Sequence, residues 1–296
     1  MVAINKYVLG ASVVGTVFGT SVLLKDYVGG GHCPSKAKIE GKTVIVTGAN
    51  TGIGKETALE LAKRGGRIIM ACRDMEKCEN AAKEIRGKTL NHNVFAKQLD
   101  LASTKSIKEF ANRILKGHFL LTNLLLDRLK ESGQSRIINV SSLAHIVGDI
   151  DLEDLNWEKK KFNTKAAYCQ SKLANVLFTN ELAKRLQGTG VTVNSLHPGV
   201  ADTELGRHTG MHKSTFSSSV LAPIFWFLIK SARQAAQPSV YLAVAEDLQG
   251  TTGKYFNALK EKEPAKQALD EETAKKLWEE SAKLVHLDEA LQECKA

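Results

Sequence analysis

The sequence predicts an α/β fold with a doubly wound parallel sheet and helices on both faces. Three observations predict it. Short β-branched runs alternate with stretches of helical periodicity, beginning with the strand-like run 44–46 and the helical stretch 55–62. A glycine-rich turn joins these first two segments. The 296 residues are 43% hydrophobic and 25% charged, which suits one large domain with a full core.

Each apolar run bounded by turn residues is assigned to a strand, and each periodic stretch to a helix. Asp74 is expected to cap the helix that it precedes. The expected order is strand 43–47, helix 53–64, strand 67–71, helix 75–86, strand 93–99, a helix from about Ser103, strand 136–141, helix 165–187, strand 191–196, helix 232–246, a short strand near 254–256 and a charged C-terminal helix.

The alternation of strand and helix breaks once. Helical residues 106–116 run directly into helical residues 117–129, and no strand-like segment separates them. A crossover between two parallel strands needs a helix, but it does not need two helices in series. We therefore expect one central strand to be missing from the sheet.

Residues 44–54 form a strand, a turn with three glycines and the start of a helix. Such a turn directs free backbone N–H groups, and the positive end of the helix, toward a bound anion. Glycine allows the backbone to bend sharply and to approach a cofactor closely. A glycine-rich loop that binds nothing is the alternative. The flanking strand and helix favour a dinucleotide site.

Tyr168 and Lys172 lie four residues apart, on one face of a predicted helix. A free phenol titrates near ~10, and an adjacent ammonium lowers its pKa, which would make Tyr168 a usable acid and base. Ser142 follows strand 136–141 at the carboxyl edge of the sheet, where parallel sheets bind ligands. We expect Ser142 to donate a hydrogen bond to a substrate oxygen. An exposed Tyr–Lys pair and a simple cap by the serine are the alternatives.

The ends of two further strands are expected to lie near the cofactor. The second strand ends at Arg73 without a carboxylate, so Arg73 is expected to pair with a 2′-phosphate, which favours NADP over NAD. Residues 194–200 end the last long strand in a rigid Pro-Gly turn at the same edge. His197 is expected to be a packed strand-end residue rather than a catalytic base.

The net charge of +9 suits nucleic acid, an anionic membrane or phosphorylated cofactors. The sequence has no zinc-ligand spacing and no stretch in which basic and aromatic residues alternate, so we expect no nucleic acid partner and no metal. A solvated basic surface without a partner is the alternative. The five cysteines form no Cys-x-x-Cys pair; they predict no disulfide framework and indicate a reducing compartment.

Residues 7–24 carry no charge, and these 18 positions are at the lower limit for a helix that spans a bilayer. A cleaved signal peptide and a shallow anchor are the alternatives. We expect a retained membrane anchor and tether over 1–37, before a single domain over 38–296. Within it, a substrate loop is expected at about 201–230, whose apolar run 220–229 covers an apolar substrate, contacts lipid or packs in the core.

The motifs resemble those of the short-chain dehydrogenase/reductase family, in its retinol dehydrogenase branch. The resemblance covers nearly the whole chain after the anchor. It implies a Rossmann-like fold and NADP(H)-dependent interconversion of retinol and retinal, or of a related apolar alcohol and aldehyde. The matching segments are Gly-Ala-Asn-Thr-Gly-Ile-Gly, Ala-Cys-Arg-Asp, Ser-Ser-Leu-Ala-His, Ala-Tyr-Cys-Gln-Ser-Lys-Leu-Ala and His-Pro-Gly-Val.

The resemblance also implies roles for single residues. Ser142 would orient the substrate oxygen, Tyr168 would transfer its proton, and Lys172 would bind the nicotinamide ribose and lower the pKa of Tyr168. Arg73 would hold the 2′-phosphate. The other cofactor contacts implied are Gly48, Ala49, Asn50, Thr51, Gly52, Ile53 and Gly54 for the phosphates and ribose, Asp100 and Leu101 for the adenine, and Pro198, Gly199, Val200 and Thr203 for the nicotinamide end.

The chain departs from the family between Lys116 and Gly117. The family carries there a fourth strand with Asn-Asn-Ala-Gly and a further catalytic Asn, on the order of 30 residues in all. Neither Asn112 nor Asn123 lies in a matching motif. The loss would remove ladder partners from the strand that ends at Thr47 and open the core. The alternative function is therefore a catalytically impaired or inactive membrane-tethered variant.

The resemblance finally implies a location. The family occupies mitochondrial and endoplasmic reticulum membranes, and we expect this chain in the mitochondrial membrane, with the endoplasmic reticulum as the alternative. The lack of an Arg-rich leader argues against simple matrix import. The expected partners are an apolar, retinoid-like substrate and membrane lipid, and association of identical copies is left open.

Overall fold

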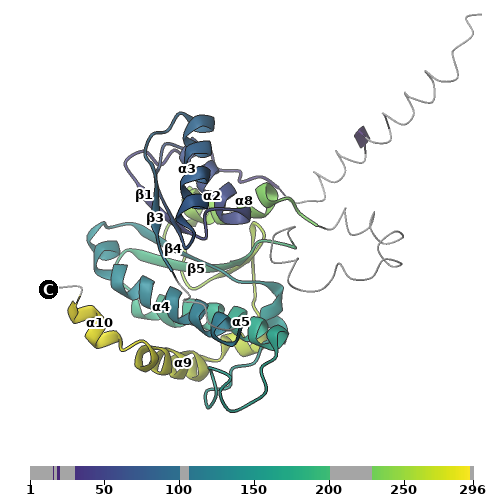
Figure 1. The fold of residues 1–296 in the computed structure, drawn as a ribbon, viewed down its shortest axis with the longest axis vertical. Coiled ribbons are helices and arrows are strands. Elements are labelled where there is room, and N and C mark those ends of the chain that lie inside the picture. The colour runs from purple at the N-terminus through teal and green to yellow at the C-terminus, as the bar shows by residue number, and fades with distance from the viewer. Residues whose placement is uncertain (1–15, 17–18, 21–30, 101–106, 201–228, 294–296) are drawn as a thin grey trace, which may run out of the picture.

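A computed structural model describes residues 16, 19–20, 31–100, 107–200 and 229–293. Strands and helices alternate in the predicted order, and the result is a Rossmann-like α/β fold with parallel strands and helices on both sides (Figure 1). The elements are β1 (Thr43–Thr47), α2 (Gly52–Lys63), β2 (Arg67–Cys72), α3 (Met75–Thr89), β3 (Val94–Gln98), α4 (Ile107–Glu131), β4 (Ser135–Val140), η1 (Leu143–Val147), α5 (Thr164–Arg185), β5 (Val191–His197), α8 (Ala232–Val244), η2 (Glu246–Leu248), β6 (Tyr255–Asn257), β7 (Lys260–Lys262), η3 (Lys266–Leu269), α9 (Glu271–Leu284) and α10 (Leu287–Glu293).

Two features near the C-terminus differ from the prediction. β7 was not expected; it returns antiparallel to β6 through a tight turn in which Ala258 has a φ of 55°. The C-terminal helix is divided into α9 and α10, because His286 between them adopts a φ of 48°. A left-handed residue cannot continue a right-handed helix, so the chain turns there.

α4 is one continuous helix across the Lys116–Gly117 junction. The two helical segments that the sequence places in series are thus a single element. Between Ile107 and the start of β4, all described residues belong to this helix or to the turn that follows it.

The strands form two sheets rather than one continuous sheet. One sheet has the order β1-β2-β3, with all strands parallel, and the other has the order β4-β5-β6-β7. β1 and β4 each end a sheet, and within the described residues each pairs with one strand only. A doubly wound sheet needs a further strand between these two to be continuous.

One face of the first sheet is apolar and partly exposed. Ile45, Ile69 and Phe95 stand in register across its three strands. The side chains of Ile45 and Phe95 remain 42% and 38% exposed. Residues on the opposite face, such as Val44 and Val46, pack instead against the core beneath α2 and α3. Exposed apolar neighbours of this kind mark a face that a doubly wound fold would cover.

α8 joins the two halves of the molecule. Val240 and Val244 pack in the core of the first sheet, with α2 and α3. Tyr241 and Leu242 pack in a core with β5 and β6. Arg136 at the start of β4 adds hydrogen bonds to two carbonyl oxygens at the C-terminal end of this helix, at 3.0 and 2.7 Å. The same helix therefore stabilises both sheets.

α5 covers the other face of the second sheet. It packs against β4 and β5, and the helices α4 and α9 pack against it (Figure 1). Phe119 of α4, Phe178 of α5 and Trp278 of α9 form one aromatic cluster, with ring centroids 4.8 to 5.7 Å apart. This packing fixes the helix on which the predicted Tyr168 and Lys172 lie.

The cysteine prediction requires a correction. Cys72 at the end of β2 and Cys78 in α3 form a disulfide, with Cα atoms 6.1 Å apart. Their spacing has no recognised signature, but the tight β2–α3 turn brings the two side chains together. Cys33 and Cys169 are free.

The described residues include no helix that is both long and apolar enough to cross a membrane. Most of the predicted anchor at 7–24, and nearly all of the predicted substrate loop, lie outside the described residues.

Candidate functional site

The turn between β1 and α2 has the geometry of an anion cradle. Gly48 and Gly52 adopt φ values of 64° and 57°, which favour glycine. A Cβ on Gly54 would lie 2.4 Å from the carbonyl oxygen of Gly48, whereas a Cβ on Gly48 would meet open space. The side chain of Thr51, the N-cap of α2, makes no capping hydrogen bond. The first N–H groups of α2 are thus left without this cap, and the turn fits a diphosphate.

Gly54→Ala should destabilise the fold by about 2 kcal/mol or more, because its Cβ collides with backbone rather than with a flexible side chain. Gly87→Ala in α3 is the matched control. A Cβ there meets nothing within 4 Å, so alanine should stabilise the helix by about 0.5–1 kcal/mol. Urea unfolding of both variants measures the difference. Equal stability of the two would contradict the close packing at Gly54.

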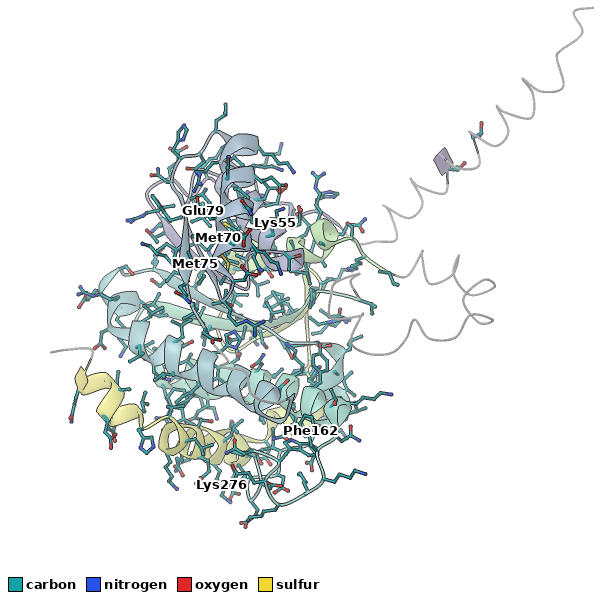
Figure 2. The ribbon with its side chains drawn as sticks, in the orientation of Figure 1. Lys55, Met70, Met75, Glu79, Phe162 and Lys276 are labelled. Carbon is teal, nitrogen blue, oxygen red and sulfur yellow. A yellow bond between two sulfur atoms is a disulfide. The ribbon has the colours of Figure 1, made fainter. Side chains whose placement is uncertain are left out.

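The region expected to bind the adenosine end lies after β2 and β3. Arg73 is exposed in the β2–α3 turn, and Asp100 is exposed after β3. Asp74 caps α3 as predicted, accepting a hydrogen bond from the N–H of Lys77 at 3.1 Å. In Figure 2 this part of the molecule holds Met70, Met75 and Glu79, while Phe162 and Lys276 lie in the other part. The expected contacts Leu101 and Thr203 lie outside the described residues.

Ser142, Tyr168 and Lys172 lie together. Ser142 lies within reach of the Tyr168 phenol, and its hydroxyl group acts to lower the pKa of that phenol. The ammonium of Lys172 lies 5.5 Å from the centre of the Tyr168 ring and donates a hydrogen bond to the carbonyl oxygen of Val140 at 3.3 Å. The neighbouring Ser141 donates its hydroxyl proton to the carbonyl oxygen of Lys172 at 2.7 Å, which ties α5 to the end of β4.

The helix that carries these groups is capped at its start. The Asn163 side chain accepts hydrogen bonds from the N–H groups of Lys165 and Ala166, at 3.0 and 3.1 Å. The capping role considered for Ser142 also occurs, because its Oγ accepts the N–H of Ala144 at 3.2 Å. Capping and contact with Tyr168 therefore coexist.

The protonation energetics differ from the expectation. Burial raises the pKa of Tyr168 above its ordinary value, and the hydrogen bond with Ser142 opposes that rise. Burial lowers the pKa of Lys172 to about 8. The predicted lowering of the Tyr168 pKa by Lys172 is absent from this structure. The reason is geometric: the ammonium lies beside the ring and donates to a backbone carbonyl rather than to the phenol oxygen.

His197 is buried at the end of β5, as expected for a packed strand-end residue. Within the described residues, its Nδ1 has no hydrogen-bond partner. Burial lowers the pKa of His197 to about 4, and the charges of Lys230 and His145 add to the effect. The ring is thus held neutral at ordinary pH.

This shift predicts a pH dependence of stability. The unfolded His197, with an ordinary pKa near 6.5, binds a proton more readily than the folded one, so stability falls as the pH drops from 6.5 toward 4. Between pH 7 and pH 5 the wild-type chain should lose about 2 kcal/mol more than His197→Leu. Urea unfolding at both pH values checks this, with exposed His92→Gln as the control. If the unfolding free energy of His197→Leu changed with pH as much as that of the wild-type chain, the prediction would be wrong.

The Pro-Gly turn after β5 contacts a residue for which the sequence has no motif. Gly199 has a φ of 99°, and a Cβ there would lie 2.6 Å from the Cδ of Lys230. The N–H of Lys230 donates to the carbonyl oxygen of Val200 at 2.7 Å. Residues 200 and 230 thus meet at the carboxyl end of β5, although 29 residues separate them in sequence.

A cavity of about 620 Å³ lies elsewhere, between α5, α9 and the β6–β7 hairpin. Its lining includes Lys184, Tyr255 and Glu271 but none of Ser142, Tyr168 and Lys172. It is therefore separate from the predicted catalytic group.

The sequence matches the family described as "short chain dehydrogenase" over residues 42–117 and 112–213. The chain belongs to this family. Its oxidoreductase class follows from that membership, and the residue pattern Ser142, Tyr168 and Lys172 lies within the matched part.

Relatives among short-chain dehydrogenases cover almost the whole chain. Human retinol dehydrogenase 13 is 63% identical over 96% of each chain. Human retinol dehydrogenase 12 is 44% identical over 88% of this chain and 92% of the relative. The alignment with retinol dehydrogenase 13 runs over 319 residues, whereas this chain has 296. That relative therefore has positions without a counterpart here.

Solved structures share the fold. An uncharacterized protein from Mycobacterium paratuberculosis is 30% identical, with a TM-score of 0.67, over 87% of this chain and 98% of its own. A short-chain dehydrogenase from Escherichia coli CFT073, solved with NADPH, is 21% identical, with a TM-score of 0.58, over 77% of this chain and all of its own.

Proposed function

We propose that this short-chain dehydrogenase is an NADP(H)-dependent oxidoreductase that interconverts retinol and retinal, or a related apolar alcohol and aldehyde. The observation that carries the proposal is the grouping of Ser142, Tyr168 and Lys172 at the carboxyl end of β4. The retinol dehydrogenase names of its relatives support the substrate class. The exposed Arg73 at the end of β2, where no carboxylate stands, supports NADP over NAD.

The residues of the chain divide the work. The first turn, from Gly48 to Gly54, would hold the diphosphate, and Arg73 would pair with the 2′-phosphate. NADP(H), when bound, supplies or accepts the hydride. Ser142 holds the oxygen of the substrate, and Tyr168 donates its hydroxyl proton to that oxygen during reduction. Lys172 keeps a positive charge beside the ring of Tyr168.

The direct test is NADPH-dependent reduction of retinal by the purified chain, with NADH in parallel. We expect turnover with NADPH and at least tenfold weaker binding of NADH, because one charge-assisted hydrogen bond contributes about 1.5 kcal/mol or more. Arg73→Ala should remove most of that preference. Binding of neither dinucleotide would overturn the proposal.

A second candidate is a catalytically impaired or inactive member of the family. The observation that favours it is the divided sheet, in which β1 lacks a second partner among the described residues and Ile45 is exposed. The family match consists of two segments that overlap at residues 112–117 instead of one continuous match, which supports the same candidate. Binding of NADPH without any turnover of retinal would favour this candidate over the first.

We propose further that residues 1–37 tether the domain to a membrane, with the mitochondrial membrane as the site and the endoplasmic reticulum as the alternative. The uncharged run 7–24 supports the tether, and an apolar substrate that dissolves in lipid agrees with it. Fractionation of a tagged chain with protease protection tests both location and facing. Recovery in the soluble fraction would contradict the tether.

A further inference from the structure

Lys230 occupies a defined place beside the predicted cofactor site. It precedes Ser231, the N-cap of α8, which forms a full capping box with Gln234. Its backbone N–H donates to Val200, and its side chain extends across Gly199. The side chain of Lys230 lies directly over Gly199, since a Cβ there would come within 2.6 to 3.0 Å of the Cδ, Cε and Nζ atoms of Lys230. The backbone of Lys230 is therefore held at the turn after β5, with its side chain over Gly199.

The topology places Lys230 at the same edge as the glycine-rich turn. α2 connects the parallel neighbours β1 and β2, and α8 connects the parallel neighbours β5 and β6. A helix that connects two such strands runs back along them, so its first turn lies at their carboxyl ends. α8 also packs along α2. The start of α8, with Lys230 before it, thus lies on the side where α2 begins.

The charge of Lys230 is not neutralised by the described part of the chain. Its side chain is partly buried, and burial lowers its pKa without an opposing contribution from any carboxylate. The charge is felt nearby, since it helps to lower the pKa of His197. A partly buried ammonium without a counter-charge is costly, and an anionic ligand would relieve that cost.

We propose that Lys230 binds a phosphate of the NADP(H) diphosphate, as a cofactor-binding residue additional to the glycine-rich turn. The inference rests on the proposed function, which names the dinucleotide. Of the groups that this reaction brings to the site, the alcohol and the aldehyde carry no charge, so the anion comes from the cofactor. The 2′-phosphate has its own cation in Arg73, which lies at the end of β2 rather than beside β5.

The test compares Lys230→Met, Lys230→Arg and Lys63→Met in the full chain. Methionine keeps an aliphatic stem against Gly199 but removes the charge. Lys63→Met removes one charge from the last turn of α2, where Lys63 pairs with Glu60 at 2.7 Å. The readouts are the dissociation constants of NADPH and of ADP-ribose, which carries the diphosphate without the nicotinamide, and urea unfolding as a check of the fold.

We expect Lys230→Met to raise the dissociation constants of NADPH and ADP-ribose about tenfold or more. The increase should be smaller at high salt. The dissociation constants of Lys230→Arg should stay within about threefold of the wild-type values, and those of Lys63→Met should equal them. Failure of the wild-type chain to bind NADPH would overturn the proposed function itself. Normal NADPH binding by folded Lys230→Met would overturn only this inference. So would an effect confined to the KM of the aldehyde, which would assign Lys230 to the substrate.

Discussion

Tyr168→Phe should lower the turnover of retinal by about 10²- to 10⁴-fold, because it removes the proposed proton donor and leaves the ring in place. The phenyl ring can keep its position near Lys172, while the influence of Ser142 on the phenol is lost with the hydroxyl group. The dissociation constant of NADPH should change by less than about threefold. Steady-state kinetics and a fluorescence titration of the same preparation measure the two quantities.

Cys169→Ser provides the matched control for this variant, since it changes the next residue on α5, a free thiol outside the proposed catalytic group. It should retain turnover near the wild-type value. Substantial turnover by Tyr168→Phe would show that another group moves the proton. Loss of NADPH binding in the same variant would instead point to a structural role for the hydroxyl group.

Restoring a strand between β1 and β4 should raise the free energy of unfolding by about 3 kcal/mol or more. The segment to insert between Lys116 and Gly117 is the strand with the Asn-Asn-Ala-Gly motif that the family resemblance leads us to expect at this junction. A new strand would pair with the open edges of β1 and β4 and help to cover Ile45 and Val140, which are 42% and 37% exposed. Each new hydrogen bond contributes about 1 kcal/mol, and apolar burial adds to this.

The comparison is made by urea unfolding and by NADPH-dependent turnover of the natural and restored chains. An insertion of the same length made of glycine and serine is the control, because it lengthens the chain without offering a strand. The restored chain should exceed both in stability and in turnover. Equal turnover by the natural and restored chains would remove the case for an impaired enzyme.

Local pattern was sufficient to predict most elements of the fold. The spacing of apolar residues in the sequence is enough to predict buried strands such as Ile68–Ala71 and the long helix α5. The division into two sheets was not predicted as such, because strand pairing depends on neighbours that are distant in sequence. β7 was missed for a related reason: its residues are Lys-Glu-Lys, and only pairing with β6 makes them a strand.

The site shows the same division between local and distant information. The four-residue spacing of Tyr168 and Lys172 fixes their common helix face, so their proximity followed from sequence. The direction of the Tyr168 pKa shift did not, since burial is set by the whole fold and outweighs the neighbouring charge. Lys230 lies over Gly199, although the two residues are far apart in sequence. No sequence motif indicates that they are neighbours.

The position of α8 affects the cooperativity of thermal unfolding. The helix gives Val240 and Val244 to one hydrophobic core and Tyr241 and Leu242 to the other. Separation of the two sheets therefore exposes apolar surface of α8 to water. Each Å² exposed costs about 25 cal/mol. Two sheets that share no ladder are in this way made thermodynamically interdependent, and heat should disrupt them in one transition rather than in succession.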